Sequence, residues 1–170
     1  MIRSFEDKSP KVHPSAWVSE AAYVVGDVEI GEGSSVWPCA VIRADFGRVV
    51  IGKKTNVQDT AVIHGDKLTE IGDNVTIGHG VIVHCRKVGS NVLLGMNATL
   101  LADAVVGDRC IVAANTVVSV GMKVPTGSMV VGSPAQVKPL KPGQAETLGD
   151  GGEYYAAMAQ RHKKNEEARR

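Results

Sequence analysis

The sequence predicts an all-β protein: a left-handed parallel β-helix, shaped as a triangular prism of about seven coils, followed by a C-terminal α-helix. Three observations predict this fold. Aliphatic residues recur every six positions, glycine often follows them directly, and aromatic residues make up only 4% of the chain. A six-residue period suits a short strand plus a corner, and three such sides close one coil of a solenoid. A helix would instead place apolar residues three or four positions apart.

The periodic aliphatic residues form four runs, separated by three short slips in the count. All are Val, Ile or Leu: Val12, Val18, Val24, Ile30, Val36, Ile42, then Ile51, Val57, Ile63, then Ile71, Ile77, Val83, then Val88, Leu94, Leu100, Val106, Val112, Val118, Val124 and Val130. Asn and Asp tolerate the left-handed backbone conformation that tight corners require. We therefore expect five such residues at corners with positive φ, namely Asn56, Asp73, Asn74, Asn91 and Asp108.

The period ends near Gly132, and this end divides the chain into three parts. Residues 1–135 are expected to form the β-helix domain, residues 136–150 a linker, and residues 151–170 a helix that packs on the prism. The proline-rich stretch at 133–142 favours an extended linker. Tyr155, Met158, Ala159 and His162 share one helical face, which favours packing of this helix.

Composition excludes several classes of function. The net charge of +1 and the pI of about 7.8 give no electrostatic reason to expect a nucleic-acid partner. The N-terminus has no apolar signal region, and no apolar run is long enough to span a bilayer. Three cysteines without CxxC spacing are typical of a reducing compartment, so a cytoplasmic protein is expected. Cys39 and Cys85 are expected to be small buried residues.

Two histidines fall at equivalent places on one side of the prism. His64 follows Ile63 and His84 follows Val83, while Arg43 follows Ile42 one coil earlier. Counting hexads places all three on the same side in three successive coils, which are separated by about 4.8 Å. His64 and His84 are therefore expected to be neighbours, close enough for both imidazoles to bind one metal ion.

His79 falls on a different side, in one column with Asp59. A side of the prism is roughly 15–20 Å long, so His79 should not reach the other two histidines of its own chain. It could reach them on a neighbouring subunit, and a closed ring of three prisms would make three equivalent sites. An isolated exposed histidine is usually only a surface residue, but three within 21 residues favour a metal site. Three imidazoles with one open position are typical of catalytic zinc, and they also accept iron(II) or cobalt(II).

Four short motifs resemble the γ-class carbonic anhydrases and their short bacterial homologues. They are Val41–Asp45, Thr55–Asp59, Val62–His64 and Ile77–His84, and the likeness covers residues 10 to about 140. The resemblance implies a homotrimer with a metal ion at each interface, His64 and His84 coming from one subunit and His79 from the next. It implies reversible hydration of CO2 to bicarbonate by metal-bound hydroxide. The residues implied in addition to the ligands are Gln58 and Asn56 beside the hydroxide, Arg43, Asp45 and Asp59 as an ion-pair set, and Tyr155 or Tyr154 from the C-terminal helix.

The chain departs from that family at two places. Phe46 stands where the best-studied members have a carboxylate, and the short segment from Gly65 to Glu70 contains only the carboxylates of Asp66 and Glu70. Because each hydration must export a proton, we expect these differences to limit turnover rather than metal binding.

Three other functions remain open from the sequence. The first is a metal-binding trimer with an assembly or binding role and little or no anhydrase activity. The second is hydrolysis of CoA thioesters, because a metal-activated water can attack a thioester carbonyl. The third is an acyltransferase, which would need only one catalytic histidine and so leaves the other two unexplained.

Overall fold

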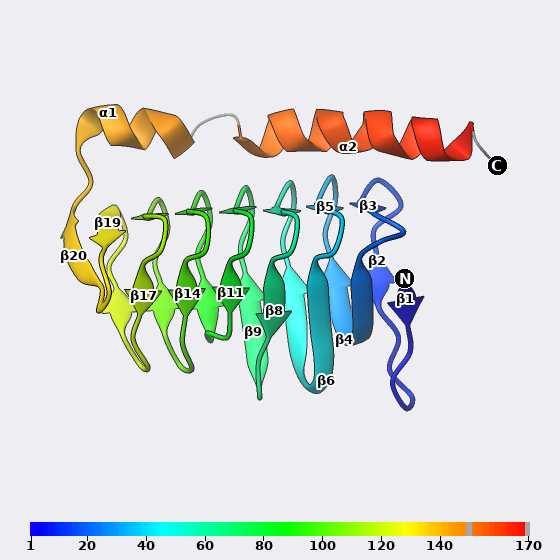
Figure 1. Ribbon diagram of the computed structural model, residues 1–170, viewed down its shortest axis with the longest axis horizontal. Helices are drawn as coiled ribbons and strands as arrows, with labels where there is room; N and C mark the ends of the chain where they lie inside the picture. Colours follow the sequence, from blue (N-terminus) through cyan, green and yellow to red (C-terminus); the bar gives the residue numbers. More distant parts are fainter. Residues whose placement is uncertain (149–150, 169–170) are drawn as a thin grey trace.

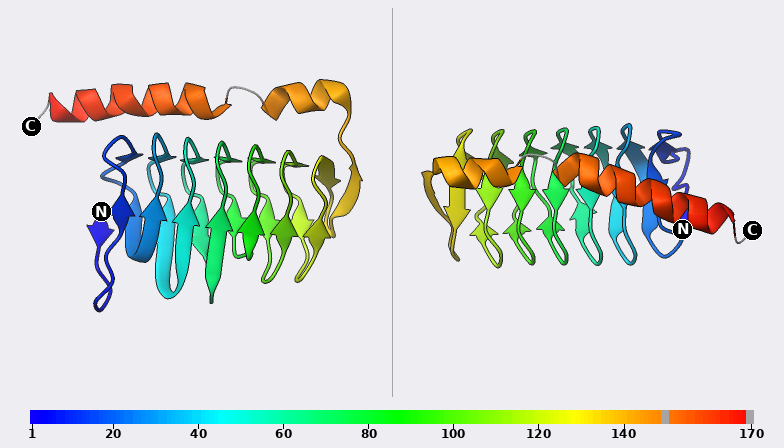
Figure 2. Two further views of the ribbon diagram at one scale, coloured as in Figure 1. Left: turned by 180° about the vertical axis from the view of Figure 1, so that it is seen from behind. Right: turned by 90° about the horizontal axis from the view of Figure 1, so that it is seen from above.

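The solenoid consists of short strands stacked in parallel on three sides of a prism, seen in the computed structural model of this chain in Figures 1 and 2. The structure describes residues 1–148 and 151–168. Its architecture confirms the predicted left-handed parallel β-helix of about seven coils followed by a helix. The three sides are called A, B and C below.

Each side collects one strand from every coil. Side B consists of β3 (Trp17–Val18), β5 (Ser35–Val36), β7 (Asn56–Val57), β10 (Thr76–Ile77), β13 (Leu93–Leu94), β16 (Ile111–Val112) and β19 (Ser128–Val131). Side C contains β1 (Ile2–Arg3), β8 (Val62–His64), β11 (Ile82–Val83), β14 (Thr99–Leu100) and β17 (Val117–Val118). Side A contains β2 (Lys11–Val12), β9 (Leu68–Ile71), β12 (Lys87–Val88), β15 (Val105–Val106) and β18 (Lys123–Val124). Two longer strands, β4 (Tyr23–Ile30) and β6 (Val41–Ile51), run round the corner from side C to side A.

The core is the column of periodic aliphatic side chains. Every one of them from Val24 to Val130 is at most 3% exposed, and Val12 and Val18 pack against this core from the first coil. The slip of the period between Ile42 and Ile51 lies within the single long strand β6. That strand carries the chain past a corner, so the longer spacing does not interrupt the core.

The corners correct one detail of the sequence analysis. Of the five residues expected there, Asn74 and Asn91 have positive φ and the other three do not. Asn56 lies in strand β7. Asp73 and Asp108 precede the corner and accept backbone N–H groups of the preceding coil, from Lys53 at 2.7 Å and from Ser90 at 2.8 Å. Their carboxylates tie successive corners together, so a side-chain role outweighs backbone conformation there.

Cys39 also differs from expectation, because it is exposed rather than buried. It occupies a corner with φ of 60°, in the same place as Thr60 and Gly80 in the next two coils. A corner of this kind turns the side chain away from the core. Cys85 is buried as expected, and burial raises the pKa of its thiol to about 12.

After the last coil the chain turns back along the prism. Strand β20 (Gln136–Pro139) pairs antiparallel with β19 and is followed by α1 (Pro142–Ala145) and a short 3-10 turn at Glu146–Leu148. Helix α2 (Gly151–Glu167) then runs over side B to the first coil, so that the last turn of the helix and the N-terminus lie at the same end (Figure 1). The expected end of the linker at residue 150 and the expected end of the helix at residue 170 lie outside the described residues. Among the residues that are described, no helix combines the length and apolar character needed to cross a membrane.

Helix α2 is held by both packing and polar contacts. Its His162 ring lies 5.1 Å from the ring of Trp17 and 5.2 Å from that of Trp37, and Trp37 also contacts Tyr155. Trp17 donates to Glu166 at 3.0 Å. The helix is therefore fixed over strands β3, β5 and β7, which places it directly above part of the candidate site.

Candidate metal centre

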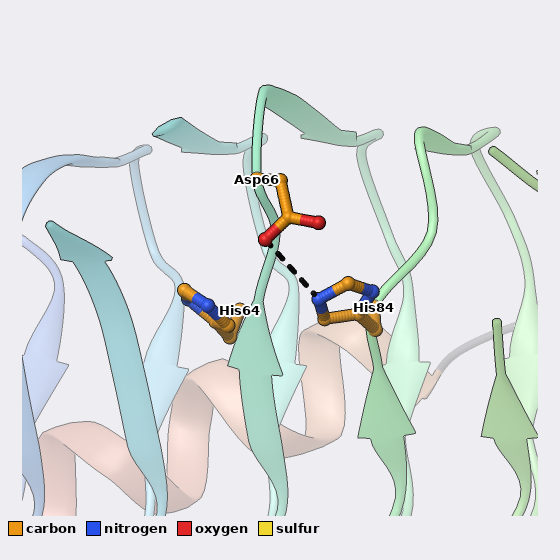
Figure 3. Close-up of side chains that lie close together, drawn as sticks. All are labelled: His64, Asp66 and His84. Atoms are coloured by element: carbon orange, nitrogen blue, oxygen red, sulfur yellow. Dashed lines mark ion pairs between the residues drawn. The ribbon is translucent and has the colours of Figure 1, made fainter. Parts of the chain in front are cut away.

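His64 and His84 lie side by side on side C, as Figure 3 shows. The register pairs Ile63 with Val83, so the two histidines occupy the same position in consecutive coils. Their ring centroids are 5.4 Å apart. Asp66 joins them, and one ligand atom from each of the three side chains lies within 4.8 Å of the others. The side-chain exposures are 15% for His64, 32% for His84 and 72% for Asp66.

The backbone orients the imidazole of His64. Its Nδ1 lies 2.9 Å from the carbonyl oxygen of Arg43, which can only accept a hydrogen bond. Nδ1 must therefore carry the proton, and Nε2 keeps a free lone pair. A hydrogen bond from the non-ligating nitrogen is the usual way in which proteins orient a metal-binding histidine.

Arg43 and Asp45 form an ion pair beside His64. One guanidinium nitrogen of Arg43 donates to Asp45 at 2.5 Å, and the other carboxylate oxygen of Asp45 lies 3.8 Å from His64 Nδ1. Partial desolvation acts to raise the pKa of Asp45. The hydrogen bond from Arg43, the local backbone N–H and the nearby positive charges outweigh it, so the pKa lies below the usual value. Asp45 is therefore an anion at neutral pH.

His79 lies on side B and is paired with Asp59. The two residues occupy the same position in consecutive coils, because Ile77 is in register with Val57. His79 Nδ1 lies 3.1 Å from an oxygen of Asp59, with the two side chains 48% and 42% exposed. A carboxylate beside Nδ1 leaves Nε2 of His79 available to a metal ion.

Gln58, Asn56 and Tyr155 form a polar group next to His79, under helix α2. Gln58 and Asn56 are 4% and 1% exposed, and Gln58 donates to Asn56 at 3.1 Å. Asn56 in turn donates to Thr76 at 3.0 Å. Tyr155 hydrogen-bonds Gln58, and its pKa is raised chiefly by burial and also by the negative charge of Asp59. Tyr154, the alternative from the sequence, is 61% exposed and contacts the Tyr155 ring instead.

The structure therefore divides the expected site residues into two groups. Arg43, Asp45, His64 and His84 gather on side C, and Asn56, Gln58, Asp59, His79 and Tyr155 gather on side B. Within the chain Arg43 pairs with Asp45, while Asp59 pairs with His79. His64 and His79, one in each group, have a polar partner at Nδ1.

The donor set fits a divalent transition metal. Neutral imidazoles bind zinc at about 2.1 Å, so two ligands of one tetrahedral ion lie roughly 3.4 Å apart. The distance from His84 Nε2 to Asp66 Oδ1 is 3.8 Å, close to this value. Only small side-chain movements would bring the ligand atoms of side C to bonding distance.

Asp66 is a candidate ligand that the sequence did not predict. From the sequence it was only one of the two carboxylates in the segment from Gly65 to Glu70. The strand ends at His64 and Asp66 lies in the bend that follows, so the alternation of a strand could not place it. His162, on the helical face expected to pack, contacts both Trp17 and Trp37 and anchors α2.

Comparisons with known proteins agree with the repeat and with the motifs. The model of the bacterial transferase hexapeptide (six repeats) matches residues 87–119. The mitochondrial γ carbonic anhydrase 2 of Arabidopsis thaliana is 36% identical over 165 residues, which are 92% of this chain and 59% of that relative. The chain thus spans less than two thirds of that protein's length.

Two further matches cover most of this chain and most of the matched protein. The carnitine operon protein CaiE of Escherichia coli K12 is 38% identical over 135 residues, which are 78% of this chain and 69% of CaiE. The crystal structure of a hexapeptide transferase family protein from Anaplasma phagocytophilum superposes with a TM-score of 0.90 at 31% identity, covering 94% of this chain and 96% of that one.

Proposed function

This chain belongs to the hexapeptide-repeat family that includes the γ-class carbonic anhydrases and the CaiE proteins, and from this membership we propose that it hydrates CO2 reversibly at a metal ion held between subunits. The division of the histidines between two sides of the prism carries the proposal. Two outward-facing half-sites on one chain make a complete three-histidine site only when side C of one subunit meets side B of another.

A strip of apolar residues on side C supports this assembly. Tyr23, Val41, Val62 and Ile82 occupy one column of the register, each directly before a buried aliphatic residue. Because alternate residues of a strand face opposite ways, this column points outward. Tyr23 and Ile82 are each 37% exposed, beside the histidines. Covering such a strip would stabilise a homotrimer, the closed arrangement that three equivalent interfaces favour.

The side chains then have distinct roles. His64, His84 and the neighbour's His79 would hold the ion, and the Nδ1 partners of His64 and His79 would keep their Nε2 atoms aimed at it. When bound, the metal supplies a water whose pKa is lowered to about 7. Gln58, fixed by Asn56 and Tyr155, would orient CO2 or bicarbonate through its amide. Arg43 and Asp45 would position His64 and the interface.

The metal and the compartment belong to the same proposal. Zinc is the metal proposed here, and iron(II) and cobalt(II) suit the same imidazoles. The three cysteines are free thiols, which supports the expectation of a reducing, cytoplasmic compartment.

A cavity beside His84 favours a second candidate, the hydrolysis of an organic thioester. It has a volume of about 380 Å³ and is lined by Asp66, His84 and the two basic residues Lys67 and Arg86, among others. CO2 does not require so large a space, whereas the phosphates and acyl group of a CoA thioester would. A metal-binding trimer without hydration activity, with a role in binding or assembly, is the third outcome to be tested.

Stopped-flow measurement of CO2 hydration decides between these candidates. We would compare zinc-loaded and anaerobic iron(II)-loaded protein with His64→Ala, and use His13→Ala as the matched control. His13 is an exposed histidine whose ring contacts Ser15, away from the site. We expect turnover that disappears in His64→Ala and persists in His13→Ala. A fully metallated trimer without hydration would refute the proposal, and hydrolysis of acetyl-CoA by that sample would favour the second candidate.

A further inference from the structure

Asp66 stands beside the two histidines of side C on a loop of the same chain. We propose that His64, Asp66 and His84 of one chain form a two-histidine, one-carboxylate site for a divalent transition metal such as Zn²⁺ or Co²⁺. A single chain would then hold the ion before a neighbouring subunit supplies His79. His64 and His84 are taken from the proposed function, and Asp66 is the new ligand.

The distance between Asp66 and His84 is the first observation behind this site. Asp66 Oδ1 lies 3.8 Å from His84 Nε2, which is too long for a hydrogen bond. It is close to the roughly 3.4 Å that separates two ligands of one tetrahedral ion. The His84 nitrogen and the carboxylate, joined by the dashed line in Figure 3, are therefore spaced as two ligands of one ion would be, and the His64 ring lies beside them.

The backbone holds Asp66 near that point. Arg48 donates its N–H to the carbonyl of Lys67 at 3.1 Å, which ties the loop to strand β6. Gly47 makes this approach possible, because a Cβ there would lie 1.8 Å from the carbonyl oxygen of Lys67. Gly65 is packed in the same way against Thr69, where a Cβ would meet the hydroxyl at 2.3 Å. The loop is thus anchored on both sides of Asp66.

The chemistry of the three ligands suits an ion that is later shared. Two imidazoles and one carboxylate bind zinc, cobalt(II) or iron(II) and leave at least one position open. Asp66 is 72% exposed and lines the cavity of about 380 Å³, so ions have a path to the site. A ligand this exposed costs little to move, and Asp66 could leave the ion when His79 of a neighbour arrives.

The test uses full-length His79→Ala, in which the proposed third histidine is absent from every subunit. Zinc affinity is measured by competition with a chromophoric chelator, and cobalt(II) absorption reports the ligand set. Asp66→Asn and Asp66→Ala are each added to His79→Ala. Asp103→Asn in the same background is the matched control, because Asp103 lines the same cavity outside the ligand cluster and has a φ of 56° that Asn tolerates. Far-UV circular dichroism checks that each variant is folded.

We expect His79→Ala to keep one metal ion per chain. Both Asp66 variants should weaken zinc binding at least about tenfold, because even the loss of a residue that only supports a ligand typically costs that much. The cobalt(II) spectrum should change in the Asp66 variants and stay constant with Asp103→Asn. Equal affinities and spectra for the Asp66 and Asp103 variants would overturn the inference. Neither readout depends on CO2 hydration, so an inactive protein that shows this Asp66 dependence would refute the proposed function and leave the metal site standing.

Discussion

Removing the carboxylate that supports His79 tests the side B half of the centre. In Asp59→Ala the contact between His79 Nδ1 and the Asp59 carboxylate, 3.1 Å long, is lost. Because a carboxylate beside Nδ1 helps to orient the ring and favours metal binding through Nε2, we expect the affinity of the assembled protein for zinc to fall. Loss of such a partner typically costs about 10–100-fold, equal to roughly 1.4–2.7 kcal/mol.

The exposure of the pair bears differently on the stability of the fold and on the affinity for metal. Both side chains are more than 40% exposed in the single chain, so water screens their interaction there. An exposed ion pair contributes only about 0–1 kcal/mol to stability, so the fold should be unaffected. In a trimer the pair would be covered and the screening reduced. We therefore expect the fall in affinity to be at least about tenfold.

The assay is chelator competition on purified protein, with native mass spectrometry to count subunits and ions. Asp27→Ala is the matched control, because Asp27 is also a half-exposed aspartate in an ion pair, 3.9 Å from Arg48. Asp59→Asn should lie between Asp59→Ala and the unmodified protein, since it keeps an acceptor and loses the charge. If Asp59→Ala binds zinc as tightly as Asp27→Ala, the carboxylate does not support a ligand and the reasoning fails.

Three further predictions follow from the structure. Tyr155→Phe removes the hydrogen bond to Gln58, so kcat for hydration should fall by up to about tenfold while zinc affinity stays constant; an equal loss of both would contradict the role given to Gln58. Leu94→Ala empties a site that is 0% exposed and should lower the free energy of unfolding in urea by about 2–5 kcal/mol, whereas Leu68→Ala, at a site 43% exposed, should cost less than about 1 kcal/mol. The pKa of Cys85 is raised from 9.0 to about 12, so the unfolded chain releases this proton first as the pH rises, and the native state should lose stability above pH 9. By pH 11 this loss should approach about 3 kcal/mol relative to Cys85→Ala in urea unfolding, and identical pH profiles for the two proteins would contradict it.

The sequence predicted the solenoid well because its repeat expresses one physical requirement many times. Each coil must bury one small aliphatic residue per side, and the periodic aliphatic residues from Val24 to Val130 are all at most 3% exposed. The stacking of His64 on His84 follows from the same count, because register in a parallel coil is set by the core.

Other features could not be read from the repeat. The exposure of Cys39 and the side-chain roles of Asp73 and Asp108 depend on corner geometry, which the six-residue period does not encode. The position of Asp66 depends on the loop that follows His64, and that loop is placed by its packing against Gly47. Residues distant in sequence decide these details.

Helix α2 changes how the solenoid should come apart. In a linear array each coil contacts only its neighbours, so the end coils normally fray first. Here Gly152 bonds to Asn74, while Gln160 and Lys163 bond to the carbonyls of Ser15 and Pro14 in the first coil. The helix thereby bridges several coils at once and joins their opening into one cooperative step. In native-state hydrogen exchange, the coils beneath α2 should open together, and the coils from Leu100 onward should set the lower limit of local stability.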